Sequence, residues 1–241
     1  MPRNEDGNVA MSEPLVLIPG LSCTAALYGP QWPALAPGRM IVVADHARDE
    51  SLGPIAKRLL AAAPERFALC GLSMGGYVAF EVMRQAPERV TRLALLDTSA
   101  KPATPETNTP REQMIALAEK GAFDNVTTLL WQRLVAAHRL TDEPLRLLVR
   151  QMAEDIGPEG FIRQQHAIMG RPDSRPGLGG ISVPTLVLVG EEDAITPVAE
   201  AQEMAEGIGA KAKLVVVPGS GHLSTLEKPE VLTQELLAWL G

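Results

Sequence analysis

The sequence contains no long apolar run. None of its stretches approaches the roughly 18 consecutive apolar residues that a membrane-spanning helix needs. Residues 1–14 are polar and acidic, and they lack the apolar region of a signal peptide. We therefore expect a short disordered lead-in to a cytoplasmic protein that has no membrane partner.

The sequence also lacks an excess of positive charge and has few cysteines. It has 22 lysine and arginine residues against 29 aspartate and glutamate residues, a net charge of −7. This balance argues against a nucleic-acid or anionic-membrane partner. Cys23 and Cys70 lie far apart without metal-site spacing, and Cys70 lies within an apolar run. We expect both to be buried free thiols in a reducing cytoplasm.

What the sequence does contain is ample material for a core, since 46% of its 241 residues are apolar. Six short apolar runs have the length and the β-branched content of strands. They are nearly continuous rather than alternating, which is typical of parallel strands covered on both faces. These runs span residues 15–19, 40–44, 67–70, 92–96, 185–189 and 213–217.

Helical patterns separate these runs. A helix over 51–63 begins at Ser51 as N-cap, and another over 74–85 follows the third run. Thr196 is expected as the N-cap of a helix that starts with Pro197. A last helix spans 223–240, with an interruption near Pro229. The alternation predicts an α/β fold with a mostly parallel sheet of about six strands flanked by helices.

One interval breaks the alternation. Residues 101–180 carry no strand signal. A loop over 101–110 and a return over 171–180, both rich in proline, enclose four expected helices over 111–121, 123–138, 143–154 and 159–169. We predict that residues 101–180, here called the cap, form an all-helical insertion into a core domain made of 1–100 and 181–241.

The segment Gly71-Leu-Ser73-Met-Gly75 matches the G-x-S-x-G pattern of a nucleophile elbow. A buried strand precedes it and a helix follows it, which is the setting that such a turn requires. The tight turn strains the serine backbone, and the glycines allow the strand and the helix to approach closely. Ser73 is therefore the candidate nucleophile at the carboxyl end of the sheet.

A serine hydroxyl needs a base, and the base needs an acid to orient it. His222 follows the last expected strand in a Gly-Ser-Gly turn, so it lies at the same edge of the sheet as Ser73. Asp193 follows the fifth strand and is the candidate acid, whereas Asp97 after the fourth strand is a competing one. The chain order of serine, aspartate and histidine is the order found in α/β-hydrolases.

An oxyanion intermediate needs backbone N–H donors. We expect one from Met74, the residue after the nucleophile. The other is expected from Leu21, in the loop after the first strand. That loop is otherwise an ordinary strand-to-helix connection.

Together these residues resemble the α/β-hydrolase superfamily, and within it the small capped carboxylesterase-like serine hydrolases. The resemblance covers nearly the whole chain, and one departure is Pro19-Gly20 where the family usually has His-Gly. It implies cleavage of carboxylic esters of small to medium acyl chain through an acyl-enzyme, without a metal or organic cofactor. Sibling activities stay open: a lactonase, a carbon–carbon bond hydrolase or a cofactor-free perhydrolase. So does a non-catalytic ligand receptor on the same fold.

The cap is expected to supply most of the substrate pocket. We predict substrate contacts from Leu21, Trp131 and His166. Arg163 and Arg171, with His166, are either partners for a substrate carboxylate or solvated surface residues. The expected partner is a small-molecule ester, and the protein is expected to be a monomer or a homodimer.

Overall fold

The computed structural model describes residues 12–241 and shows a single parallel sheet of six strands in the order β2-β1-β3-β4-β5-β6. The predicted lead-in lies outside the described residues up to residue 11, and Ser12 to Pro14 already belong to the first strand. All six predicted strands are present. They are β1 Ser12–Ile18, β2 Arg39–Val43, β3 Phe67–Leu72, β4 Val90–Leu96, β5 Thr185–Gly190 and β6 Ala212–Val217.

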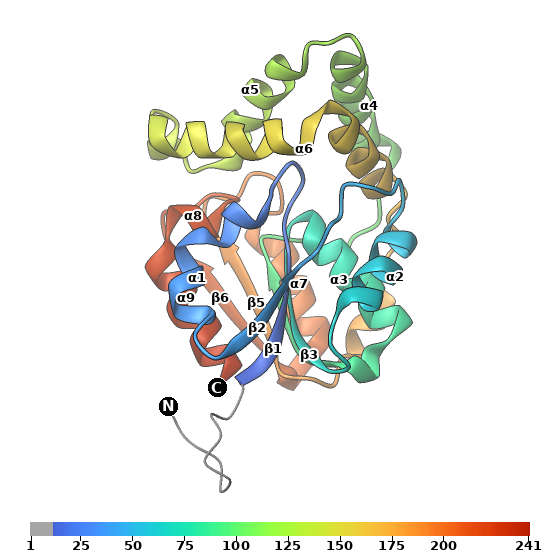
Figure 1. Ribbon diagram of the computed structural model, residues 1–241, viewed down its shortest axis with the longest axis vertical. Helices are drawn as coiled ribbons and strands as arrows, with labels where there is room; N and C mark the ends of the chain where they lie inside the picture. Colours follow the sequence, from blue (N-terminus) through green and yellow to red (C-terminus); the bar gives the residue numbers. More distant parts are fainter. Residues whose placement is uncertain (1–11) are drawn as a thin grey trace, which may run out of the picture.

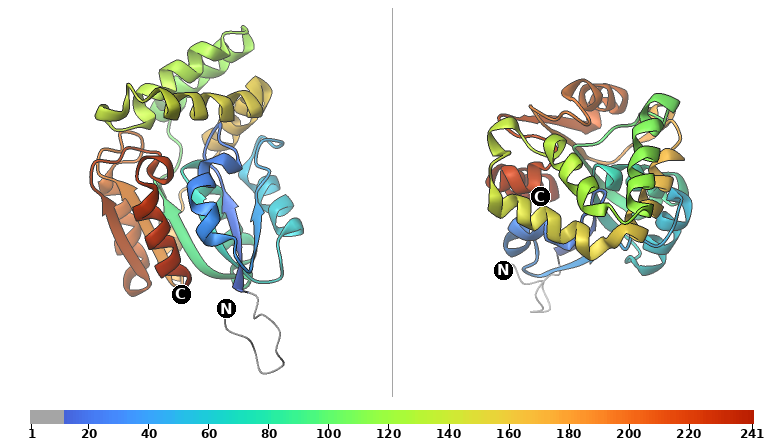
Figure 2. Two further views of the ribbon diagram at one scale, coloured as in Figure 1. Left: turned by 60° about the vertical axis from the view of Figure 1, so that its left-hand side comes forward. Right: turned by 90° about the horizontal axis from the view of Figure 1, so that it is seen from above.

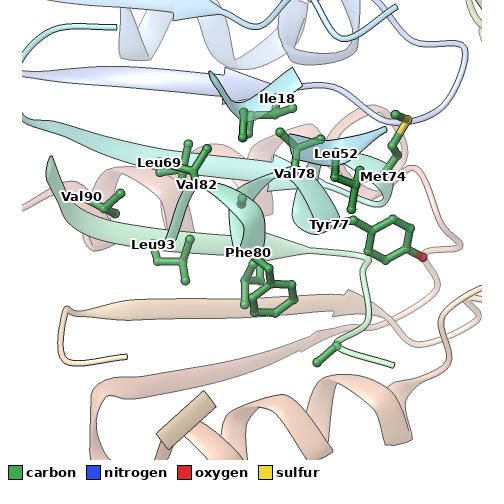
Figure 3. Close-up of a cluster of buried hydrophobic side chains, with 14 of the residues drawn as sticks. Ile18, Leu52, Leu69, Met74, Tyr77, Val78, Phe80, Val82, Val90 and Leu93 are labelled. Carbon is green, nitrogen blue, oxygen red and sulfur yellow. The ribbon is translucent and has the colours of Figure 1, made fainter. Parts of the chain in front are cut away.

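Helices cover both faces of the sheet (Figure 1). Successive side chains of a strand point to opposite faces. Leu15 and Leu17 of β1 therefore pack in one apolar cluster with residues of α1 (Trp32–Leu35) and α9 (Pro229–Leu240). Val16 and Ile18 pack in a second cluster, drawn in part in Figure 3, with residues of α2, α3 and α7. These three helices span Leu52–Ala62, Met74–Gln85 and Val198–Ile208.

The near-continuous apolar runs have the expected cause. Every residue of β3 and of β5 is buried, because both strands lie inside the sheet and are covered on both faces. The edge strands β2 and β6 are only partly buried. Parallel strands end at one edge of the sheet, so the loops after β1, β3, β4, β5 and β6 meet there.

Three cap helices lie across that edge (Figures 1 and 2). They are α4 Pro105–Glu119, α5 Phe123–Leu134 and α6 Glu143–Met169. Gly157 interrupts α6 with a φ of 71°, so this element corresponds to two of the predicted helices. The predicted loop over 101–110 is wrong in its second half. Thr104 forms a capping box with Thr107, and α4 begins at Pro105.

Two further boundaries differ from the sequence prediction. The helix expected over 123–138 ends at Leu134, because Val135 adopts an extended backbone conformation. Thr196 does not cap α7, whose N-cap is Pro197, because the Thr196 hydroxyl donates to Asp193 instead. The expected break near Pro229 is confirmed, since it separates α8 (Ser224–Glu227) from α9. Short 3-10 turns complete the structure at Ala25–Gln31, Pro87–Arg89, Ala137–Arg139, Arg175–Gly180 and Gly209–Lys211. Among residues 12–241, no helix combines the length and the apolar character needed to cross a membrane.

Candidate active site

Ser73 sits on a strained turn between β3 and α3, with φ 54° and ψ −115°. The surrounding glycines are required by packing. A Cβ on Gly71 would lie 2.3 Å from the carbonyl oxygen of Gly75, and one on Gly75 would lie 2.1 Å from that of Ile18. A Cβ on Gly76 would lie 2.3 Å from the Thr98 hydroxyl oxygen. The pattern Gly-Leu-Ser-Met-Gly-Gly therefore encodes the close contact of α3 with β1 and with the end of β4.

His222 lies in the turn after β6, and its ring is buried. Its Nε2 is 2.8 Å from the Ser73 hydroxyl oxygen, and its Nδ1 is 2.7 Å from Oδ2 of Asp193. A carboxylate can only accept, so Nδ1 carries the proton and Nε2 is left to accept from Ser73. Burial lowers the pKa of His222, but the charge of Asp193 and its hydrogen bond to Nδ1 outweigh this effect, so the pKa lies above the usual value.

Asp193 is held in place by the turn after β5. Its Oδ1 accepts hydrogen bonds from the backbone N–H groups of Ile195, at 2.8 Å, and Thr196, at 3.0 Å. Its Oδ2 accepts from the Thr196 hydroxyl at 2.8 Å. Burial raises the pKa of Asp193, but His222 and these donors outweigh it, so the pKa falls below its usual value. The carboxylate therefore stays ionised beside the imidazole.

The competing acid, Asp97, has other partners. Its Oδ1 accepts from the backbone N–H of Gly190 at 2.9 Å, and its Oδ2 accepts from the Ser224 hydroxyl. It therefore joins the end of β4 to β5 and to the start of α8, two residues after His222. Burial, with the charge of Asp193, raises the pKa of Asp97 to about 8. The structure brings Asp193, and not Asp97, to Nδ1 of His222.

Leu21 lies in a loop that is fastened on both sides. His46 contacts the Gly20 carbonyl oxygen through Nε2 at 2.9 Å, and the Ser22 N–H donates to the Gln164 side chain at 2.9 Å. A Cβ on Gly20 would be 3.5 Å from that of Ser73, so this loop passes beside the nucleophile. Met74 opens α3, and the first N–H groups of a helix have no partner within it. Both residues expected to supply N–H groups therefore lie next to Ser73.

Glu227 is a site residue that the sequence patterns did not reveal. Its carboxylate accepts from the backbone N–H groups of Ala136 (2.8 Å), Gly221 (3.0 Å) and Leu223 (3.2 Å). Two of these donors flank His222, and the third belongs to the cap. A carboxylate a few residues after the histidine is the only local signal for this role. Nothing in the local pattern indicates that Ala136 is a partner.

A cavity of about 570 Å³ connects the site with the cap. Ser73, His222 and Leu21 line it, together with the cap residues Met114, Leu130, Leu134, Val149, Ala153 and Ile168. Trp131 and His166 do not. Trp131 is buried within the cap, with its indole N–H donating to the Leu140 carbonyl oxygen at 3.1 Å, and His166 faces Glu50 at 3.8 Å. The structure therefore moves the expected substrate contacts from these two side chains to others of the cap.

The polar groups of the site favour acyl chemistry. Within residues 12–241, no cluster of three or more histidine, cysteine, aspartate or glutamate side chains is arranged to hold a metal ion. The two cysteines are free and buried. What the site does hold is a serine, a histidine and an aspartate linked by hydrogen bonds, which is suited to nucleophilic attack on an acyl carbon.

Comparison with known proteins gives concordant matches. The model of the alpha/beta hydrolase family matches residues 15–235. A pimeloyl-[acyl-carrier protein] methyl ester esterase from Nitrosomonas europaea is 29% identical over 198 residues, which cover 76% of this chain and 73% of that protein. A thermophilic esterase from Thermogutta terrifontis is similar in structure, with a TM-score of 0.86 and 29% identity over 96% of this chain and 90% of that one. An enol-lactonase from Burkholderia xenovorans has a TM-score of 0.86 and 25% identity over 99% and 94% of the two chains.

Proposed function

The chain belongs to the alpha/beta hydrolase family, and within that family of hydrolases we propose that it is a serine esterase acting on carboxylic esters of small to medium acyl chain. The observation that carries the proposal is the chain of hydrogen bonds from Ser73 through His222 to Asp193, at 2.8 Å and 2.7 Å, facing a largely apolar cavity. The esterase relatives from Nitrosomonas and Thermogutta support the choice of an ester substrate.

In the proposed reaction, the Ser73 hydroxyl attacks the ester carbonyl carbon while His222 Nε2 takes its proton. The N–H groups of Leu21 and Met74 donate to the oxyanion that forms. When the tetrahedral intermediate collapses, the C–O bond to the alcohol breaks and His222 returns the proton to the leaving alkoxide. A water, activated by the same imidazole, then releases the acid from Ser73. Asp193 orients His222 and stabilises its charged form in both halves.

Labelling with a fluorophosphonate tests the nucleophile. The native protein is expected to react, and Ser73→Ala is expected not to. Ser99→Ala is the matched control, because Ser99 is a second serine of the same cavity and should leave labelling intact. Equal labelling of the native protein and of Ser73→Ala would contradict the assignment. A native protein that does not react at all would favour a ligand receptor on this fold.

A lactonase is the second candidate, favoured by the similarity to the Burkholderia enol-lactonase. It uses the same three residues, and the ring oxygen of the lactone takes the place of the leaving alcohol. One panel of p-nitrophenyl esters, lactones and a peroxide-dependent assay separates the esterase from the lactonase and the perhydrolase. The free, buried state of Cys23 and Cys70 supports a reducing, cytoplasmic setting for this chemistry.

A further inference from the structure

The walls of the cavity carry more positive than negative charge, although the whole chain has a net charge of −7. Two acidic residues, Glu106 and Glu200, line the cavity. The basic residues that line it are Lys101, Arg111, Arg133, Arg171 and Arg175. An anionic protein with a cationic cavity concentrates anions there.

Two of these basic side chains are already neutralised. The Lys101 ammonium is 3.3 Å from the Glu200 carboxylate, and Arg175 is 2.7 Å from Asp173 and 3.5 Å from Glu203. Since these charges have partners in the protein, they contribute little net charge to a ligand site.

The other three guanidinium groups hydrogen-bond to neutral groups. Arg111 donates to the side-chain oxygen of Gln165 at 2.7 Å, and its buried Nε has no hydrogen-bond partner among the described residues. Arg133 donates to the Ala194 carbonyl oxygen at 3.0 Å, and Arg171 donates to the Ile168 carbonyl oxygen at 3.0 Å. Burial lowers the pKa of Arg111 to about 10, and the nearby charges of Arg171 and Arg133 add to this effect. Arg111 still carries its charge at neutral pH. These three guanidinium groups face one remaining acidic lining residue, Glu106, so the cavity wall keeps a net positive charge.

Tyr77 links these charges to the nucleophile. It follows Ser73 by four residues at the start of α3, so it lies about one helical turn from the reacting hydroxyl. The Arg171 guanidinium lies 4.8 Å from the centre of its ring. Figure 3 shows the Tyr77 ring at the margin of the apolar cluster, with the hydroxyl directed away from the labelled side chains. Burial raises the pKa of Tyr77, so the hydroxyl remains protonated and can donate.

We propose that the cavity is selective for substrates that carry a second, ionised carboxylate, which is bound by the Arg111 and Arg171 guanidinium groups and the Tyr77 hydroxyl. Guanidinium groups match the planar geometry of a carboxylate. Arg133, on the exposed surface of α5, attracts the anion toward the cavity. The inference rests on the proposed reaction at Ser73 and specifies its substrate class: hemiesters of dicarboxylic acids, or esters whose alcohol part bears a carboxylate.

Matched substrates test this selectivity. We expect the native protein to prefer p-nitrophenyl hemiesters of straight-chain dicarboxylic acids over neutral esters of equal length, measured as a ratio of kcat/KM. A second pair of substrates consists of an ester that carries a carboxylate on its alcohol part and a neutral ester of equal length. Comparing the two pairs shows on which side of the ester bond the anion binds. The absence of a preference in both pairs would overturn the proposal.

Arginine variants locate the selectivity. In Arg111→Gln the preference should fall by about tenfold to a hundredfold, as expected for the loss of a charge-assisted hydrogen bond. Arg146→Gln is the matched control, because Arg146 is an exposed cap arginine paired with Glu143 and should leave the ratio unchanged. If Arg111→Gln does not fold, the substrate preference is measured in Arg111→Lys, which lacks the planar guanidinium group, and in Tyr77→Phe, which lacks the hydroxyl. The preference should fall in both variants. An unchanged preference in the folded variants would overturn the proposal.

A binding measurement separates this inference from the proposed function. Isothermal titration calorimetry measures the binding of a straight-chain dicarboxylate to Ser73→Ala and to the double variant that carries both Ser73→Ala and Arg111→Gln. The double variant should bind the dicarboxylate about tenfold more weakly or worse. If the native protein hydrolyses no ester but this difference is observed, the esterase proposal fails and the anion site stands. If the native protein hydrolyses neutral esters and the dicarboxylate does not bind, the anion site fails and the esterase proposal stands.

Discussion

Ser22, Ser73 and Asp97 adopt positive φ angles of 56°, 54° and 43°, and all three lie at the carboxyl edge of the sheet. Such backbone conformations are unfavourable for residues other than glycine and are maintained only where the surroundings fix them. Ser73 donates its N–H to the Leu96 carbonyl oxygen, Asp97 to that of Leu188, and Ser22 to Gln164. At the scale of single residues, the strain is therefore concentrated around the candidate nucleophile.

Replacing each acid separately tests the different partners of Asp193 and Asp97. Asp193→Asn should lower kcat for a p-nitrophenyl ester by roughly three to four orders of magnitude, because the amide no longer stabilises the imidazolium or fixes its tautomer. Asp97→Asn should lose no more than about tenfold, since its bonds hold backbone and Ser224 and leave Nδ1 of His222 untouched. A larger loss in Asp97→Asn than in Asp193→Asn would contradict the assignment.

The ionisation of His222 predicts the pH profile. Only the neutral imidazole can accept the proton of Ser73, so kcat/KM should fall as the pH decreases through the pKa of His222. That pKa is raised, so we expect the acid limb above the usual histidine value of about 6.5. In Asp193→Asn the carboxylate that raises the pKa is lost, and the residual activity should show a limb at lower pH. If the acid limb lies at the same pH in Asp193→Asn as in the native protein, the titrating group is not His222.

At the scale of elements, the site depends on how closely α3 packs against the sheet. Gly75 lies in the first turn of α3, directly against the Ile18 carbonyl at the end of β1. The loop after β1 carries Leu21, so the same contact fixes the distance between the two expected oxyanion donors. The glycines that identify the elbow in the sequence therefore also position the oxyanion loop.

Gly75→Ala should lower the free energy of unfolding by about 3 kcal/mol or more, because the new methyl group would lie 2.1 Å from a backbone oxygen that cannot rotate away. Urea unfolding monitored by circular dichroism measures this change. Gly29→Ala is the control, since a Cβ on Gly29 would have nothing within 4 Å and the φ of this residue is not positive. Similar stability losses in the two variants would show that the close contact of Gly75 with the Ile18 carbonyl does not exclude a side chain at this position of α3.

At the scale of the whole molecule, the turns after three strands are tied together by buried carboxylates. Asp97 joins β4 to β5 and α8, and Glu227 joins the His222 turn after β6 to Ala136 of the cap. His222 and Leu223 also donate their backbone N–H groups to the Leu134 carbonyl oxygen, each at 3.1 Å. The histidine turn is therefore fastened to the end of α5 as well as to the sheet.

Asp97 also predicts a dependence of stability on pH. Its pKa in the folded protein is about 8 and that of an exposed carboxyl group is 3.8, so between these values the unfolded chain loses the proton more readily. The contribution of Asp97 to stability is therefore full below pH 3.8 and is lost as the pH rises toward 8. Asp97→Asn cannot ionise, so its stability relative to the native protein should increase between about pH 5 and about pH 8, by on the order of a few kcal/mol. Urea unfolding of both proteins at the two pH values measures their free energies of unfolding. A difference between the two proteins that is the same at both pH values would contradict the prediction.

Local sequence patterns were sufficient for the sheet and for the residues that meet at its edge. Apolar runs identified all six strands, because strands covered on both faces must be apolar throughout. The glycines around Ser73 and the turns that carry Asp193 and His222 placed these three residues at strand ends. In a parallel sheet those ends share one edge, so the proximity of the three followed from the topology.

What the sequence by itself determined was thus the fold class and the meeting of Ser73, His222 and two candidate acids, Asp193 and Asp97, at one edge of the sheet. Only the tertiary structure decided that Asp193 rather than Asp97 contacts His222, that Glu227 holds the histidine turn, and that Arg111 rather than Trp131 or His166 lines the cavity. The physical reason is that strand and helix patterns arise from contacts between residues close in sequence. The orientation of a side chain into a cavity depends instead on contacts between segments far apart in the chain, such as α4, α6 and the turns of the sheet.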